Sequence, residues 1–325
     1  KMGTGVVRYL KNPIVGVIDK KLAGKQMREF MDTTKEVPIL ATLKEAILKG
    51  AEVLVLGIAP SGGKIPESWN PVIEEALDNG LSIVNGLHDV LNERWSQHIK
   101  NPLKQWIWDV RIPLFTPEIA TGKASQLQNK RVLFIGTDMA VGKMTAGLEL
   151  YSWLLEHKKK VGFVATGQIG ITIIGKGIPL DAFKVDHACG AVEQVVLDQA
   201  DKDIILIEGQ GSLLHPGSTA TLPLMRGSCP THLILCLRAE IKTLRSPEHI
   251  KIPDLNNFIA LNESLASVFG TFSRSRVIGI AANTSMLSED DAKAYLSMTS
   301  KHTGLVTTDP IRYGIAPIGE QILMS

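Results

Sequence analysis

The feature that most constrains this chain is a glycine-framed loop at residues 134–145, which reads Phe-Ile-Gly-Thr-Asp-Met-Ala-Val-Gly-Lys-Met-Thr. The apolar residues 131–135 predict a strand before the loop, and the residues after it predict a helix. Such a loop turns backbone N–H groups inward, and a helix N-terminus and Lys143 add positive charge. The sequence therefore predicts a binding site for the diphosphate or triphosphate of a ligand.

This loop departs from the usual phosphate-loop pattern in two ways. Five residues separate Gly136 from Gly142, where the pattern has about four, and Met144 stands where Ser or Thr normally binds Mg²⁺. Thr145 can substitute if the helix begins in a shifted register, so the use of Mg²⁺ stays open, because a thioether does not suit this hard cation. The residues that we expect at the phosphate site are Gly136, Thr137, Asp138, Ala140, Val141, Gly142, Lys143, Met144 and Thr145.

Composition excludes several classes of protein. The 325 residues suffice for two domains, and 44% apolar with 21% charged residues is ordinary globular usage. A net charge of +2 gives no electrostatic reason to expect nucleic acid as a partner. Cys189, Cys229 and Cys236 lack the spacing of a zinc site or a disulfide framework. Because no long apolar run and no signal peptide are visible, we expect a cytoplasmic protein without a membrane partner.

The first half alternates between strands and helices at the spacing of parallel βαβ units, which predicts a doubly wound, Rossmann-like sheet. The predicted strands are residues 13–19, 52–57 and 81–85, and the predicted helices are residues 22–31, 42–49 and 66–79. A Pro- and Gly-punctuated connector at 112–125 follows. We therefore expect an α/β protein with a Rossmann-like domain at 1–125 and a P-loop NTPase-type parallel sheet at 126–325.

Several polar residues follow the strands of the first half, at the edge where ligands bind in α/β sheets. Lys64 ends a glycine-containing loop, 59–64, that is either an anion site or a flexible connection. His88 is either a site residue or a surface histidine. Asp109 pairs with Arg111 or serves an active site. Asp19 binds a ribose or caps a helix.

The second half continues with strands and helices in alternation. Residues 203–207 form a strand that ends in Glu208, the pattern of a Walker B carboxylate that holds a metal. His215 is a candidate general acid or base, or a structural contact. Asn283, after a strand at 276–281, can recognise a base edge, and residues 307–310 are expected to cap a final helix.

The loop Gly-Thr-Asp-x-x-Val-Gly-Lys, Glu208-Gly209 and Asn283 resemble dethiobiotin synthetase, a family that binds ATP on a parallel P-loop sheet. A resemblance over nearly the whole chain is to a bacterial and archaeal family with an N-terminal Rossmann-like and a C-terminal P-loop domain. It is carried by Asp19 with Ala23-Gly24-Lys25, residues 57–60 and 62–63, Gly86-Leu87-His88, Asp109-Val110-Arg111, residues 136–145, Thr166-Gly167-Gln168 and residues 207–212.

Some members of that family are D-glutamate N-acetyltransferases, which implies acetyl transfer from acetyl-CoA to an amino acid. In this reading His88 or His215 deprotonates the amine, and Lys64, Arg111 and Gln168 bind the substrate. The pyrophosphate of coenzyme A occupies the phosphate loop without catalytic Mg²⁺, in keeping with Met144. One alternative is a ligase or kinase that uses Mg-ATP, held by Thr145 and Glu208. Another is a nucleotide-gated regulatory protein, and we expect a homo-oligomer in each case.

Overall fold

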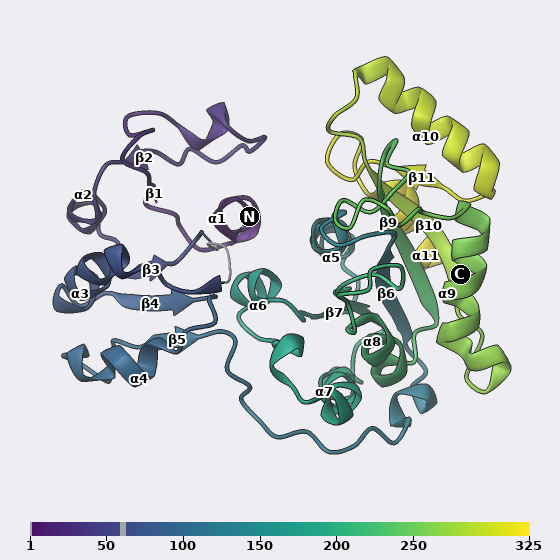
Figure 1. The fold of residues 1–325 in the computed structure, drawn as a ribbon, viewed down its shortest axis with the longest axis horizontal. Coiled ribbons are helices and arrows are strands. Elements are labelled where there is room, and N and C mark those ends of the chain that lie inside the picture. Colours follow the sequence, from purple (N-terminus) through teal and green to yellow (C-terminus); the bar gives the residue numbers. More distant parts are fainter. Residues whose placement is uncertain (1, 59–62) are drawn as a thin grey trace. The chain divides into compact units, whose positions relative to one another are not determined.

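The structure is a computed structural model that describes residues 2–58 and 63–325 (Figure 1). By the packing of its backbone, the chain divides into two compact units. Unit 1 comprises Lys1–Leu114 and Gln168–Ala182, and unit 2 comprises Phe115–Gly167 and Phe183–Ser325. Each unit is an α/β structure, and all strand pairs in the described ladders are parallel. The expected fold class is thus confirmed.

Within the connector at 112–125, residues 112–114 group with unit 1 and residues 115–125 with unit 2, so by backbone packing the chain divides after Leu114, and we predicted the boundary at residue 125. The backbone N–H and the hydroxyl of Thr121 donate to Glu193 Oε2 at 2.8 and 3.2 Å. Ala124, in the short helix η5 (Lys123–Gln126), is fully buried. These contacts fasten the connector to unit 2 before the predicted boundary is reached.

Unit 1 contains two separate parallel ladders in its described residues, where we predicted one doubly wound sheet. Strands β1 (Val17–Ile18) and β2 (Ile39–Leu40) form one ladder. The other has the order β3 (Val53–Val55), β4 (Ser82–Asn85) and β5 (Ile107–Asp109). The helices of this unit are α1 (Met2–Tyr9), α2 (Leu43–Leu48), α3 (Asn70–Asp78), α4 (Leu91–Trp95) and α6 (Gln168–Ile174).

The predicted helix at 22–31 is wrong. Gly24 adopts φ +87°, and its N–H donates to the carbonyl of Ile39. The N–H of Met27 likewise donates to Val37, so the backbone of this segment pairs with the segment before β2. Only the short 3-10 helix η1 (Met27–Glu29) forms. Apolar spacing favoured a helix, but tertiary pairing satisfied the same backbone groups in another way.

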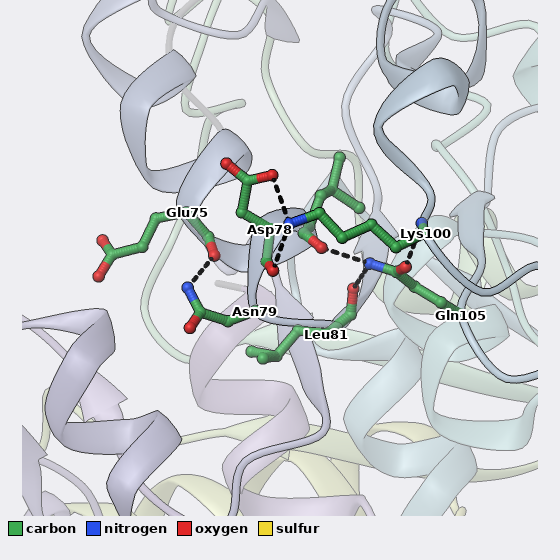
Figure 2. A network of polar contacts seen from close by, with 7 residues as sticks. Glu75, Asp78, Asn79, Leu81, Lys100 and Gln105 are labelled. Carbon is green, nitrogen blue, oxygen red and sulfur yellow. Dashed lines mark hydrogen bonds and ion pairs between the residues drawn. The ribbon is translucent and has the colours of Figure 1, made fainter.

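The C-terminal end of α3 shows how unit 1 satisfies its orphan carbonyls (Figure 2). The buried Gln105 amide donates to the carbonyl oxygens of Leu77 and Leu81 at 2.8 and 3.0 Å. Lys100 Nζ donates to the carbonyl of Asp78 at 2.9 Å and lies 3.1 Å from its carboxylate. These contacts join the end of α3 to the loop before β5 and hold the β4–β5 pair in place.

Unit 2 is a parallel sheet with the order β11-β10-β9-β6-β8-β7 in the described part of the chain. Its strands are β6 (Lys130–Gly136), β7 (Val161–Val164), β8 (Ile204–Ile207), β9 (His232–Arg238), β10 (Arg276–Asn283) and β11 (Thr307–Thr308). Helices α5 (Lys143–Glu156) and α11 (Ala316–Met324) pack together against the sheet. Helices α8 (Thr221–Ser228) and α9 (Leu255–Ser267) also pack on the sheet, and α7 (Val185–Leu197) packs on α8. Helix α10 (Glu289–Thr303) packs beside β11.

The strand order places a crevice beside β6. From β6 the chain passes through α5 towards β7, whereas β9 lies on the other side of β6 and leads towards β10. Because the connections leave β6 and β9 in opposite directions, their loops separate at the carboxyl ends. This is the position at which open α/β sheets bind ligands.

The expectation that residues 307–310 cap a helix is also wrong. Thr307 and Thr308 form the edge strand β11, and α11 begins only at Ala316. Asp309 Oδ2 instead accepts from the N–H and hydroxyl of Thr284, at 2.8 and 2.6 Å. The carboxylate therefore fixes the turn after β10.

No helix in the described residues is long and apolar enough to span a bilayer.

Candidate functional site

The phosphate loop connects β6 to α5 in a conformation that requires its glycines. A Cβ on Gly136 would lie 2.8 Å from Val141 Cγ2 and 3.0 Å from Lys143 Nζ. Gly142, the residue before α5, adopts φ +110°, a backbone conformation that residues other than glycine rarely adopt. Ala140 also has a positive φ, of 56°. The loop therefore curls back tightly over the end of β6, as an anion nest requires.

Lys143 is the cation at the centre of this loop. It is buried, and its Nζ donates to the carbonyl of Asp138 at 2.9 Å. Burial lowers the pKa of Lys143 to about 8, although Cys236, Asp138 and Glu208 raise it. The ammonium is thus poorly compensated within the protein, and an anionic ligand would restore the interactions that it lost with water.

Asp138 fixes the loop from within. Its buried carboxylate accepts from the N–H of Met139 at 2.6 Å and from the N–H of Arg245 at 2.9 Å. The N–H of Thr137 donates to the carbonyl of Cys236 at 3.1 Å. The loop after β6 is therefore tied to the segment after β9, across the crevice that the strand order creates.

Glu208 follows β8, as its Walker B-like pattern predicted, but its carboxylate is engaged by the backbone. Oε2 accepts from the N–H groups of Thr166 and Gly167 at 2.9 and 3.1 Å. Burial raises the pKa of Glu208 to about 7, against the lowering effect of those two hydrogen bonds and of Lys143. In this arrangement Glu208 positions the turn after β7. It also lies near enough to Lys143 for each charge to shift the pKa of the other.

The residues expected to hold Mg²⁺ are Thr145 and Glu208. Met144 and Thr145 are both half-buried in the first turn of α5. The Thr145 hydroxyl makes no hydrogen bond with any described residue, so this oxygen can reach a ligand or an ion, whereas the Met144 thioether is a poor donor to Mg²⁺. The oxygen set is thus smaller than that of a usual Mg-nucleotide site.

Asn283 lies at the carboxyl end of β10, in register with Arg238 of β9. Its Oδ1 accepts from the N–H of Ser285 at 3.0 Å. Its amide nitrogen donates to no acceptor among the described residues, which leaves that group for the base edge that we predicted.

His215 does not have a nitrogen available to act as a base in this structure. Its Nε2 lies 2.6 Å from the carbonyl of Ser246, which can only accept, so Nε2 carries the proton. Its Nδ1 accepts from the N–H of Gly217 at 3.1 Å. The ring therefore joins the turn after β8 to the segment after β9, which corresponds to the structural alternative.

In unit 1 the structure brings the expected substrate residues to the carboxyl ends of β4 and β5. Lys64 is exposed next to Gly63, whose carbonyl accepts from the N–H of His88 at 2.9 Å. Arg111 Nε donates to the carbonyl of Gly86 at 2.9 Å, and a Cβ on Gly86 would lie 3.3 Å from the side chain of Gln168. The rest of the loop at 59–64 lies outside the described residues.

Within this cluster the side chains are not equally free. The Arg111 guanidinium is paired with Asp181, so a substrate carboxylate would compete with that aspartate. Asp109 is buried and accepts from Asn85 and from the backbone at the start of α4, which is a structural role. Asp19 accepts from the N–H of Lys21 and caps a turn. Lys64 and the exposed His88 remain the freer groups.

Sequence reasoning missed the basic residues after β9. Two adjoining hollows, of about 20 and 490 Å³, lie beside the phosphate loop, and both are open to solvent. Their basic lining residues are Arg238, Lys242, Arg245 and Lys251. The signal was available, because these cations fall within fourteen residues of sequence, 238–251, although only the tertiary structure places them beside residues 137–141.

A glycine loop between a central parallel strand and a helix, with a buried lysine, defines a P-loop domain, here joined to a Rossmann-like unit. The chain belongs to the DUF1611 family. Residues 118–319 match the family's domain of unknown function described as a P-loop domain (DUF1611_C), and residues 20–113 match its Rossmann-like domain (DUF1611_N). The resemblance inferred from the sequence is thus confirmed.

Relatives extend over most of the chain. It is similar to a DUF1611 family protein of Anabaena variabilis known from a crystal structure, with 43% identity and a TM-score of 0.94 over 100% of this chain and 95% of that one. A D-glutamate N-acetyltransferase of Pseudoalteromonas sp is 37% identical over 278 residues, 84% of this chain and 82% of the relative. Another, of Tritonibacter scottomollicae, is 36% identical over 275 residues, 84% and 81% of the two chains.

Proposed function

We propose that this chain is an N-acetyltransferase that moves the acetyl group of acetyl-CoA to the amino group of an acidic amino acid, with D-glutamate as the first acceptor to test. The structural observation that carries the proposal is a P-loop with a buried lysine but a thioether, Met144, directly after it. Such a loop suits a pyrophosphate that needs no tightly held Mg²⁺. The names of the two relatives supply the reaction.

The fit of coenzyme A rests on the charge of the loop. The N–H groups at the start of α5 and the ammonium of Lys143 would hold the pyrophosphate. The absence of a Mg²⁺-binding hydroxyl at Met144 would not hinder this role, because the 5′-pyrophosphate of coenzyme A is not cleaved. Bound acetyl-CoA supplies an activated thioester, and the chain's own residues supply the binding and orientation of both substrates.

The transfer itself balances without any further reactant. The acceptor ammonium loses a proton, because only the free amine has a lone pair for attack. Its nitrogen bonds to the thioester carbonyl carbon, the carbon–sulfur bond breaks, and the thiolate of coenzyme A leaves and takes up a proton. The net products are an N-acetyl amino acid and free coenzyme A. His88 is the candidate for the first proton transfer, since both nitrogens of His215 are engaged by the backbone.

The acceptor's carboxylates call for cations, and unit 1 offers Lys64 and Arg111. Lys64 is exposed, whereas Arg111 is shared with Asp181. We assign the first carboxylate contact to Lys64 and a secondary one to Arg111, with Gln168 as a neutral donor nearby. A guanidinium could grip a carboxylate through two hydrogen bonds once the aspartate is displaced.

A second candidate function is an ATP-dependent ligase or kinase. The observation that favours it is the carboxylate of Glu208 after β8, close enough to Lys143 to affect its pKa. Mg-ATP would then use Thr145 and Glu208, and ADP would be released. A nucleotide-gated regulatory protein would bind either ligand without turnover.

One assay separates these functions. The purified protein is incubated with acetyl-CoA and D- or L-glutamate, with and without EDTA, and the released thiol and the N-acetyl product are measured; parallel reactions contain ATP, Mg²⁺ and the same acids. We expect thiol release that depends on the acceptor and survives EDTA. ADP release without acetyl transfer would instead support the ligase or kinase, and binding without turnover would support a regulator. Lys143→Ala is the control that should abolish each activity.

A further inference from the structure

The segment between β9 and α9 is a short hairpin. Thr243 and Lys251 form an antiparallel bridge. The N–H of Leu244 donates to the carbonyl of Ile250, and that of Ile252 donates to Lys242, both at 2.9 Å. We call residues 242–252 the basic hairpin.

Two contacts fasten the basic hairpin beside the phosphate loop. The N–H of Arg245 donates to the carboxylate of Asp138 in the loop at 2.9 Å. The carbonyl of Ser246 accepts from His215 at 2.6 Å. Backbone groups of the hairpin, rather than its exposed side chains, make both contacts.

The cations on and beside this hairpin lack partners. Within the described residues, the side chains of Lys242, Arg245, Lys251 and Arg238 make no hydrogen bond and no ion pair. The hollows also contain two carboxylates, but Asp138 is engaged by backbone N–H groups and Asp254 by His302 at 2.7 Å. Positive charges that lie close together without partners repel one another, and an anionic ligand would relieve this repulsion.

The walls of the larger hollow are suited to more than a bare anion. Ile252, Pro253, Leu255 and the half-buried Tyr295 line it together with the cations. The two hollows share Thr137, Arg238, Ile241 and Ile252, so they adjoin each other between the phosphate loop and the basic hairpin. A nucleoside with phosphate groups at two separate positions fits this arrangement of a phosphate loop, an apolar wall and a group of cations.

We propose that the basic hairpin binds the phosphate on the 3′ position of the ribose of coenzyme A, while the phosphate loop binds the 5′-pyrophosphate. This inference rests on the proposed use of acetyl-CoA. A phosphomonoester carries a charge of about −1.5 to −2 at neutral pH, which Lys242, Lys251 and their neighbours would meet. All phosphates of ATP belong to one chain at the 5′ position, so ATP gives no separate anion for the hairpin.

The test compares coenzyme A with 3′-dephospho-coenzyme A by calorimetric titration of the full chain. We expect the wild type to bind coenzyme A at least about tenfold more tightly than 3′-dephospho-coenzyme A. This is the effect of one or two hydrogen bonds between charged groups. The double variant Lys242→Gln/Lys251→Gln should lose that preference and keep its affinity for the dephospho form. Arg274→Gln is the matched control, because Arg274 is exposed, precedes the amino end of β10 and does not line either hollow.

The outcomes separate this inference from the proposed function. Equal binding of the two ligands by the wild type, or no binding of either, overturns the inference, and so does a preference that survives in the double variant. If acetyl transfer occurs but the preference is absent, only the inference fails. If the preference is present but no acetyl transfer occurs with any acidic amino acid, only the proposed function fails.

Discussion

At the scale of single residues, Lys143 combines burial with a charge that the protein does not fully compensate. Lys143→Met removes the cation and its desolvation cost together. We expect affinity for coenzyme A to fall by at least about tenfold, because a charge-assisted contact to phosphate is lost. The melting temperature of the ligand-free protein should not fall. Calorimetric titration and thermal unfolding test this, with the exposed Lys176→Met as control; unchanged affinity would remove Lys143 from the binding site.

The lowered pKa of Lys143 also makes binding depend on pH. The ammonium of the free protein loses its proton as the pH rises through about 8, whereas phosphate groups are already ionised there. Affinity of the wild type for coenzyme A should therefore decline above that pH, while Lys143→Met shows no such decline. A flat profile for the wild type would contradict this.

Glu208 gives a pH dependence of stability rather than of binding. Its pKa is raised from 4.5 to about 7 in the folded protein. The folded state therefore holds the proton more tightly, and this contribution to stability is present below about pH 4.5 and is lost as the pH rises through about 7. Glu208→Gln keeps an oxygen for the N–H groups of Thr166 and Gly167 but cannot ionise.

We expect the free energy of unfolding of Glu208→Gln, relative to wild type, to increase between pH 5 and pH 8 by up to about 3 kcal/mol. Urea unfolding at both pH values measures it, and Glu156→Gln, at the exposed end of α5, is the control. A difference between variant and wild type that is the same at both pH values would show that Glu208 does not titrate in this window.

Substitution of His215 can show whether this residue positions the basic hairpin or acts in catalysis. Because both ring nitrogens hold backbone groups, His215→Ala should loosen the basic hairpin and raise KM for acetyl-CoA by about three- to tenfold, the effect of one lost hydrogen bond. The kcat at saturating acetyl-CoA should change little. A fall in kcat of about a hundredfold or more, with KM unchanged, would instead identify a general base.

At the scale of elements, the end of α3 depends on a single buried amide (Figure 2). Gln105→Ala removes the side-chain donor of the Leu77 and Leu81 carbonyls, of which the Leu77 carbonyl still accepts from the N–H of Gly80 at 3.0 Å. Unpaired buried acceptors cost about 1–3 kcal/mol each, so we expect a loss of that order in the free energy of unfolding. Lys100→Ala, which removes an exposed contact at the same helix end, should cost about 1 kcal/mol or less. Chemical denaturation compares the two, and equal losses would contradict the role of Gln105.

Prediction of elements from sequence succeeded where burial and periodicity agreed. The apolar run before the phosphate loop is β6, the run at 203–207 contains β8, and the run at 276–281 lies within β10. Prediction failed at 22–31, where the backbone pairs with residues 37–39, and at 307–310, where a carboxylate fixes a distant turn. Local spacing cannot reveal which backbone groups a remote segment will satisfy.

At the scale of the whole molecule, the two units are not simple halves of the chain. Helix α6 belongs to unit 1, where it packs on α1. A fragment comprising residues 115–325 would keep α6 but lose that partner and expose Gly170, Ile171 and Thr172. We expect fast amide exchange over residues 168–182 in this fragment and protection after residues 1–114 are added. Full protection in the isolated fragment would show that α6 needs no partner.

The sequence by itself determined the phosphate loop, because its glycines, its lysine and the flanking strand and helix are contiguous and their roles are local. It also determined the parallel α/β class and the family. Only the tertiary structure decided that Glu208 and His215 are held by backbone groups and that Arg238, Lys242, Arg245 and Lys251 lie beside the loop. These features arise because the strand order brings the end of β9 next to that of β6, and the chain's local sequence does not specify that order.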